Sequence, residues 1–121
     1  MGKINSRQKG ARGEREFAGI CRGYGYEARR GQQYCGANGD ADVVGLPGIH
    51  AEIKRVERLN LEDAIAQSVR DAKEGEIPMV AHRKNNCEWL ITMRAENWFE
   101  LYREWEAGRY IGRCEMDKDC N

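Results

Sequence analysis

Two short apolar segments on either side of Pro47-Gly48 place the strongest constraint on how this chain can fold. They cover residues 41–46 and 49–56, and Pro-Gly is a common turn signal, so we expect two neighbouring strands of a hairpin. Both strands carry acidic residues where alternation would allow apolar ones. Because side chains repeat every second residue along a strand, Glu52 and Lys54 share one face with His50.

The length of the turn decides whether Asp42 and Glu52 meet. If the loop had two residues, Asp42 would lie opposite Ile53, and the two carboxylates would lie on opposite faces of the hairpin. A loop of odd length, or one β-bulge, places Asp42 opposite Glu52. We therefore predict an odd loop or a bulge between residues 45 and 50.

Two close carboxylates on neighbouring strands are typical of a site for a divalent cation. They repel each other unless a cation lies between them, and oxygen ligands suit Mg²⁺ or Mn²⁺. Such a cation stabilises charge on a phosphate and lowers the pKa of a bound water. Lys54 would hold that water or neutralise developing charge, and the backbone carbonyl of Ile53 would be a further ligand. The alternative is an exposed hairpin that carries an ordinary Glu–Lys pair.

Two residues outside the hairpin are candidates for the same site. Glu14 lies in line with the apolar side of the first expected helix, where an unpaired carboxylate is costly unless it faces a cation. Its alternative is an edge position paired with Arg15 or Arg22. Gln67 lies beside the apolar stripe of a later helix, where it either reaches the same pocket or remains solvated.

The rest of the chain alternates between helical and strand patterns. We expect helices over residues 8–24, from an N-cap at Asn60 to Gly75, and around residues 98–105, with further strands over residues 26–30, 77–82 and 87–93. The order of helix, three strands, helix, two strands and helix predicts an α/β fold with helices packed on a mixed sheet. We expect one domain over residues 1–121 with loose tails at 1–7 and 108–121.

The aromatic side chains of the last expected helix recur at helical spacing. Trp98, Leu101, Tyr102 and Trp105 lie three, four and seven residues apart from the first of them. We interpret this stripe as part of the core and not as a platform on which bases stack.

Composition excludes some classes of protein. The chain is 33% charged and 40% hydrophobic, which is typical of a globular protein, and no apolar run is long enough to cross a membrane. The formal net charge is zero, but residues 1–35 carry a net charge of +5 and residues 57–121 a net charge of −4. A chain polarised in this way can present a positive face to phosphates, the alternative being a basic helix that is merely solvated.

The five cysteines are an odd number at irregular spacing. This pattern argues against a secreted disulfide scaffold and favours the cytoplasm, with reduced thiols. A zinc site built from Cys114, Cys120 and either His82 or His50 is a third alternative. It is disfavoured because the two cysteines lack the short spacing usual in structural zinc sites.

These residues resemble the PD-(D/E)XK nuclease superfamily. Within it the chain is most similar to the archaeal-type Holliday-junction resolvases and their phage-encoded relatives. The likeness covers roughly residues 8–93. The matching elements are Lys9-Gly10 with Gly13-Glu14-Arg15-Glu16-Phe17, Asp42-Val43-Val44, Glu52-Ile53-Lys54, and Gln67. Ala41 stands where the family often has proline.

The resemblance implies a restriction-endonuclease-like fold and an endonuclease that depends on Mg²⁺, with Mn²⁺ as a substitute. Asp42 and Glu52 would bind the metal, Lys54 would be catalytic, Glu14 would support them, and Gln67 would be an accessory residue. It also implies a homodimer that nicks a four-way junction symmetrically, in the cytoplasm of a bacterial or phage-infected cell. The residues expected to contact DNA are Lys9, Arg12, Arg29, Arg30, Gln32, Gln33 and Arg55.

Two other functions remain open from the sequence. One is a relative of the same fold that acts on flaps, nicks or DNA ends. The other is a DNA-binding module that keeps the fold without catalysis. A cleavage assay on a panel of branched and linear DNA distinguishes them.

Overall fold

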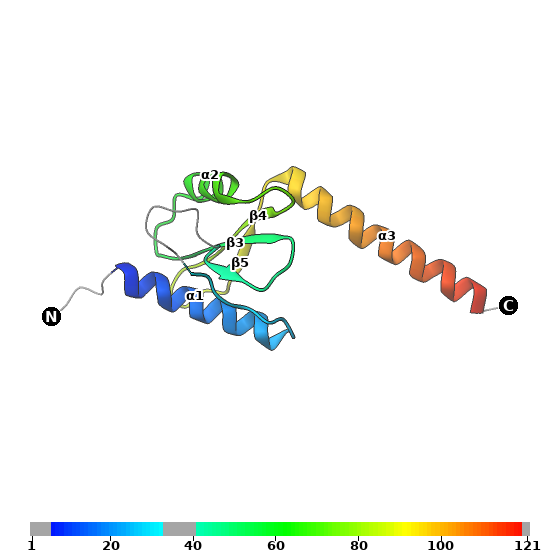
Figure 1. Cartoon of the computed structure of the whole chain (residues 1–121), viewed down its shortest axis with the longest axis horizontal. Helices are drawn as coiled ribbons and strands as arrows, with labels where there is room; N and C mark the ends of the chain where they lie inside the picture. The colour runs from blue at the N-terminus through cyan, green and yellow to red at the C-terminus, as the bar shows by residue number, and fades with distance from the viewer. Residues whose placement is uncertain (1–5, 33–40, 120–121) are drawn as a thin grey trace.

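The chain folds into a mixed five-stranded sheet with three helices, in the order that the sequence predicts (Figure 1). The computed structural model describes residues 6–32 and 41–119, with side chains for residues 10–32 and 41–111. The helices are α1 (Ser6–Gly23), α2 (Leu61–Asp71) and α3 (Ala95–Asp119). The strands are β1 (Arg29–Arg30), β2 (Val43–Val44), β3 (Ile49–Arg55), β4 (Ile77–Arg83) and β5 (Leu90–Thr92).

The strands lie in the sheet in the same order as in the sequence, from β1 to β5. Only β3 and β4 pair in parallel, and α2 forms the crossover between them. The side chain of Asn60 accepts a hydrogen bond from the backbone N–H of Asp63, so Asn60 is the N-cap of α2 as the sequence predicts. None of the described helices is long and apolar enough to cross a membrane.

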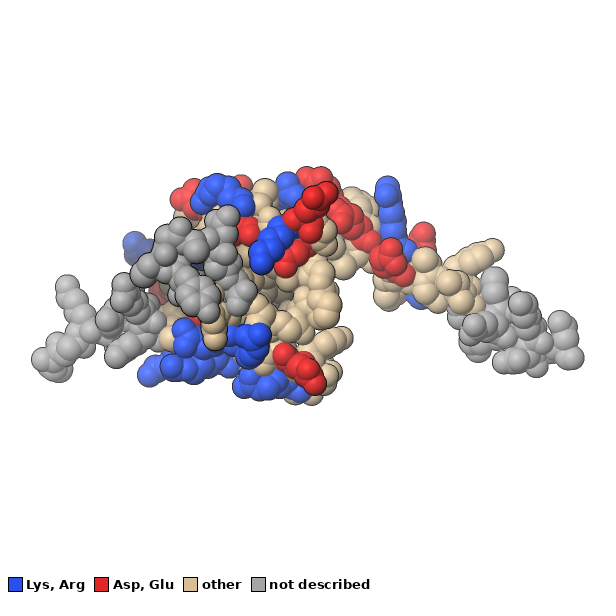
Figure 2. All heavy atoms as spheres, viewed as in Figure 1, with Lys and Arg blue, Asp and Glu red and all other residues tan. Residues whose placement is uncertain are grey.

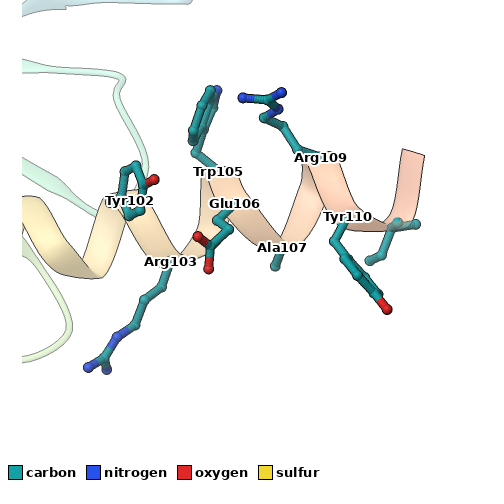
Figure 3. A pocket seen from close by; sticks show the side chains of 8 residues that line it. Tyr102, Arg103, Trp105, Glu106, Ala107, Arg109 and Tyr110 are labelled. Atoms are coloured by element: carbon teal, nitrogen blue, oxygen red, sulfur yellow. The ribbon is translucent and has the colours of Figure 1, made fainter. Parts of the chain in front are cut away.

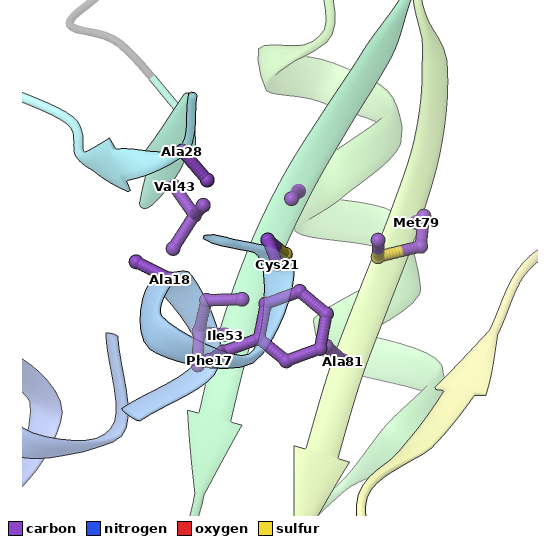
Figure 4. Close-up of a cluster of buried hydrophobic side chains, with 9 residues drawn as sticks. Phe17, Ala18, Cys21, Ala28, Val43, Ile53, Met79 and Ala81 are labelled. Atoms are coloured by element: carbon purple, nitrogen blue, oxygen red, sulfur yellow. The ribbon is translucent and has the colours of Figure 1, made fainter. Parts of the chain in front are cut away.

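The two faces of β3 differ in chemistry. Ala51 and Ile53 pack with Phe17 and Cys21 of α1 in the main hydrophobic cluster (Figure 4). His50, Glu52 and Lys54 alternate with these residues and therefore face the other layer, where α2 contacts β3 and β4. One strand thus carries the core on the α1 side and its polar residues on the α2 side.

The turn between β2 and β3 confirms the prediction of an odd loop. Val43 pairs with Ala51, which leaves the seven residues 44–50 between the paired positions. The same register places Asp42 opposite Glu52. Gly45 has a φ of 104°, and a Cβ atom there would overlap the carbonyl oxygen of Glu27. The turn therefore needs glycine both for its backbone conformation and for the close approach of the segment before β1.

Three predicted strands are shorter in the structure. Residues 26–30, 41–46 and 87–93 contribute only β1, β2 and β5. For β2 the reason is visible, because the carboxylate of Asp42, and not a backbone carbonyl, accepts the N–H of Ile53. The Asp42 side chain thus takes the place of the next backbone hydrogen bond between the strands, and regular pairing of β2 with β3 ends there.

The predicted tails are wrong in part. α1 begins at Ser6, and α3 continues to Asp119 without the break predicted after residue 107. The apolar period fades beyond Trp105 because glycine and charged residues take its place. None of the residues after Trp105 prevents a helix, however, so backbone hydrogen bonding continues. α2 also ends at Asp71, earlier than the predicted Gly75.

The aromatic stripe of α3 was expected in the core, and this prediction is wrong. Trp98, Tyr102 and Trp105 are exposed, and α3 extends away from the sheet and the other two helices (Figure 1). The reason is topological, since α1 and α2 already cover the two faces of the central strands.

Replacing Gly45 by alanine is expected to destabilise the fold strongly. The positive φ and the overlap with the Glu27 carbonyl together should cost at least about 3 kcal/mol in the free energy of unfolding, measured in urea. Gly48→Ala is the matched control. Gly48 also has a positive φ, of 83°, but a Cβ atom there meets nothing, so we expect a loss of about 1 kcal/mol. Equal losses for the two variants would contradict the packing argument.

Candidate functional site

Asp42 and Glu52 form a buried pair of carboxyl groups where β2 meets β3. Their residues are only 8% and 3% exposed. The two side chains share a hydrogen bond, and Asp42 Oδ2 also accepts the backbone N–H of Ile53 at 2.9 Å. The sequence predicted this convergence from the odd loop, and the structure brings the two side chains together.

The environment keeps a proton on this pair. Burial and the charge of Glu52 raise the pKa of Asp42 to about 7, against a smaller opposing effect of the Ile53 N–H. Burial also disfavours ionisation of Glu52, but hydrogen bonds from His50 and Asp42 outweigh it and lower the pKa of that carboxyl. Because two adjacent buried carboxylates cannot both ionise cheaply, Asp42 holds the proton and Glu52 the charge at pH values below about 7.

His50 supports Glu52 from two positions further back along β3. Its Nε2 lies 2.7 Å from Glu52 Oε1, and its Nδ1 lies 3.7 Å from Glu76 Oε1. The hydrogen bond to Glu52 raises the pKa of His50 despite its burial. The imidazole therefore fixes the orientation of Glu52 and balances its charge.

Lys54 and Gln67 meet as the sequence suggested. Lys54 Nζ donates to Gln67 Oε1 at 3.2 Å, which links β3 to α2. Both side chains are half-buried. The ammonium group keeps further N–H donors beyond the one that Gln67 accepts.

Glu14 does not remain unpaired. Its Oε2 accepts a hydrogen bond from Arg30 Nε at 2.8 Å, and the carboxylate adds a small contribution to the raised pKa of Asp42. The partner is neither Arg15 nor Arg22, the two arginines considered from the sequence. Sequence spacing along one helix could not reveal a partner that β1 supplies.

Asp71 is a candidate ligand that sequence reasoning missed. One donor atom each from His50, Glu52 and Asp71 lies within 4.8 Å of the others, and this is the one such group of three among the described residues. Asp71 lies one turn beyond Gln67 on α2, so the four-residue spacing was a signal that could have found it.

The donor set on the Asp42 side fits a hard divalent cation. It offers two carboxylates, and the Ile53 carbonyl lies on the same side as the Ile53 N–H, toward Asp42. On the other side of Glu52, His50 adds an imidazole nitrogen, which suits Mn²⁺ or Zn²⁺ better than Mg²⁺.

The residues expected to contact DNA do not form one exposed group. Arg12, Arg29 and Gln32 are exposed, and Arg30 pairs with Glu14. Arg55 is half-buried on the α1 side of the sheet, where its Nε lies 3.7 Å from Glu16 Oε2, so it links β3 to α1. The side chains of Lys9 and Gln33 lie outside the described residues. Lys and Arg side chains nevertheless gather over α1, in the lower part of Figure 2.

The zinc alternative gains no support. His82 Nε2 lies 2.8 Å from Thr92 Oγ1, and His50 is bound to Glu52. The side chains of Cys114 and Cys120 lie outside the described residues.

The comparisons with known proteins assign no family. No protein-family model matches the chain, and a search of curated proteins finds no similar sequence. The likeness to PD-(D/E)XK nucleases therefore remains a prediction from the motif residues.

Stability without divalent cations should depend on pH through Asp42. A carboxyl whose pKa is raised on folding stabilises the folded state below its ordinary pKa, and this stabilisation is lost as the pH rises through about 7. The free energy of unfolding should therefore fall between pH 5 and 8, by up to about 1.4 kcal/mol per pH unit below the pKa. Asp42→Asn should flatten this profile in urea titrations, whereas Glu74→Gln, at an exposed position, should keep it. An unchanged slope in Asp42→Asn would exclude Asp42 as the titrating group.

Proposed function

We propose that this protein is a metal-dependent endonuclease that hydrolyses DNA phosphodiester bonds. The observation that carries the proposal is the buried Asp42–Glu52 pair with Lys54 two residues further along β3. Burial of two facing carboxyl groups is costly without a cation, and buried ionisable groups with shifted pKa values gather at functional sites. Here the arrangement also matches the ordered motif residues of the resemblance.

Asp42, Glu52 and the carbonyl of Ile53 would hold the cation, with Mg²⁺ or Mn²⁺ as the best fit to oxygen ligands. When bound, such an ion supplies charge stabilisation on the phosphate and lowers the pKa of a coordinated water. His50 orients Glu52 for this task through the 2.7 Å contact. Asp42 must release its proton before it can act as a ligand.

Lys54 is the group placed to act on the phosphate or on the attacking water. Gln67 holds Nζ from the α2 side and so restricts where the ammonium group points. The remaining N–H donors of Lys54 are then available to hold the water or to neutralise charge that develops on a phosphate oxygen. Gln67 is thus a positioning residue for Lys54.

A cavity of about 530 Å³ adjoins Lys54 and supports a nucleic-acid substrate. Arg58 and Arg70 line it together with Gln67, and the described residues offer neither arginine an ion-pair partner. Unpaired arginines next to a catalytic lysine suit phosphates that flank the bond to be cut.

The preference for four-way junctions follows from the resemblance to Holliday-junction resolvases. One chain carries one Asp42–Glu52 pair, so symmetric cleavage of a junction requires a homodimer. The cytoplasm, where thiols stay reduced, suits the odd number of cysteines. A nuclease for flaps, nicks or ends, or a binding module without catalysis, remains the alternative.

Cleavage of labelled four-way junctions, flaps and linear duplexes with Mg²⁺ tests the proposal. Wild type should cut the junction fastest, and Asp42→Asn, Glu52→Gln and Lys54→Met should each lower the rate by about 10²-fold or more. Glu62→Gln, an exposed position on α2, should cut like wild type. Cutting of flaps or linear DNA alone would reject the resolvase assignment. Wild-type rates in Glu52→Gln would reject the site, and junction binding without any cutting would favour the binding module.

Thermal unfolding with added Mn²⁺ locates the cation. Wild type should gain in melting temperature because an ion bound to the folded state stabilises it. Asp42→Asn should lose the gain, whereas Asp71→Asn should keep it if the ion lies between Asp42 and Glu52. Loss of the gain in Asp71→Asn with retention in Asp42→Asn would instead place the ion beside His50.

A further inference from the structure

The aromatic side of α3 is the most unusual surface of the described chain. Trp98, Leu101, Tyr102 and Trp105 lie along one side of this helix of 25 residues, and all are exposed. The helix leaves the sheet after β5 and extends away from it (Figure 1). At a rise of 1.5 Å per residue, its 25 residues span about 37 Å. Large apolar side chains that gather on one exposed face mark an interaction surface.

These side chains form an ordered row. The rings of Trp98 and Tyr102 stack at 5.1 Å with an angle of 18°, and Tyr102 contacts Trp105 at 5.5 Å. The guanidinium of Arg109 lies 4.8 Å above the Trp105 ring, and Figure 3 shows both on the side of the helix away from Tyr110. Because the rings already hold one another, little side-chain entropy remains to be lost when a partner covers them.

The charge of α3 argues against nucleic acid as the partner. From Ala95 to Ile111 the helix carries four glutamates and two arginines. Phosphates would be repelled by this net negative charge. The row itself holds no charged side chain between Trp98 and Trp105, so an apolar protein surface is its natural complement.

We propose that α3 is a self-association arm, in which the face made by Trp98, Leu101, Tyr102 and Trp105 packs against the same face of a second copy of this chain. A two-fold axis places the same patch on both sides of such an interface, and an uncharged row is complementary to itself. Pairing of this kind leaves the Asp42–Glu52 site of each copy free.

The exposed area suits a weak but specific dimer. Trp98 is 48% and Trp105 is 54% exposed, and Leu101 and Tyr102 are each 38% exposed. A whole aromatic side chain buries 150–250 Å², so the three rings of this face can bury roughly 300 Å² in each copy. With Leu101, Phe99 and the stems of flanking residues, the total over both copies approaches about 1,000 Å², the lower limit for specific interfaces, so we expect weak association.

This inference deepens the homodimer that the proposed function requires, but its evidence is independent of the cleavage chemistry. A symmetric pair of arms would join two catalytic domains without covering either site. Each domain could then approach one strand of a branched substrate.

Sedimentation velocity of the full chain between 1 and 200 µM tests the arm. Wild type should convert from monomer to dimer in the micromolar range, with a blue shift of tryptophan emission over the same concentrations. Trp98→Ala together with Trp105→Ala should weaken association at least tenfold and leave the far-UV circular dichroism unchanged, because alanine favours a helix. The matched control is Tyr110→Ala on another side of α3, which is 70% exposed and should associate like wild type.

Other results would overturn the arm. A wild-type monomer at 200 µM would exclude a second copy as the partner, and quenching of its tryptophan emission by junction DNA would assign the row to nucleic acid. Undiminished association of the double variant would place the dimer interface elsewhere. The two proposals can fail separately. A wild-type dimer that cuts no DNA refutes the nuclease, and a wild-type monomer that cuts junctions refutes the arm. The inactive Glu52→Gln variant should dimerise like wild type.

Discussion

The buried pair of Asp42 and Glu52 depends on the antiparallel register between β2 and β3. Val43 pairs with Ala51, and the next pair outward brings two carboxyl groups face to face in a buried position. The two groups would repel if both were ionised. The pKa of Asp42 is therefore raised, so that it keeps its proton more readily, and hydrogen bonds stabilise the charge of Glu52. A divalent cation between the two groups would also remove their repulsion. The energetic cost of burying them together is therefore the argument for function.

The helices on the two sides of β3 fix this pair of residues in different ways. On one side the cluster of Phe17, Ile53 and Met79 anchors the strand to α1 and fixes its position. On the other side α2 supplies Gln67, which holds Lys54, and brings Asp71 close to His50. Because successive residues of β3 point to opposite sides, its apolar side chains pack on α1 while its polar side chains form the site on the α2 side.

Sequence reasoning predicted best those contacts of the site that depend on geometry within one hairpin or one helix. The N-cap at Asn60 was predicted directly, and strand alternation makes Asp42 meet Glu52 once the loop is odd or bulged. The sequence left open whether Gln67 reaches Lys54 or stays solvated, and α2 decides this. The salt bridge from Glu14 to Arg30 did not follow, because its partners lie on different elements. The role of Arg55 was missed for the same reason, since Glu16 of α1 holds it beneath the sheet.

The sequence by itself determined the order of helices and strands and the set of polar residues that could meet, because both depend on periodicities of two and 3.6 residues. Only the tertiary structure decided which amphipathic faces would be buried. The stripe of α3 has the pattern of a core helix, yet the central strands already have α1 and α2 as covers, so Trp98 and Trp105 remain exposed. Periodicity shows that a helix has an apolar face. Whether that face is buried depends on whether the sheet still has an uncovered face for the helix to pack on.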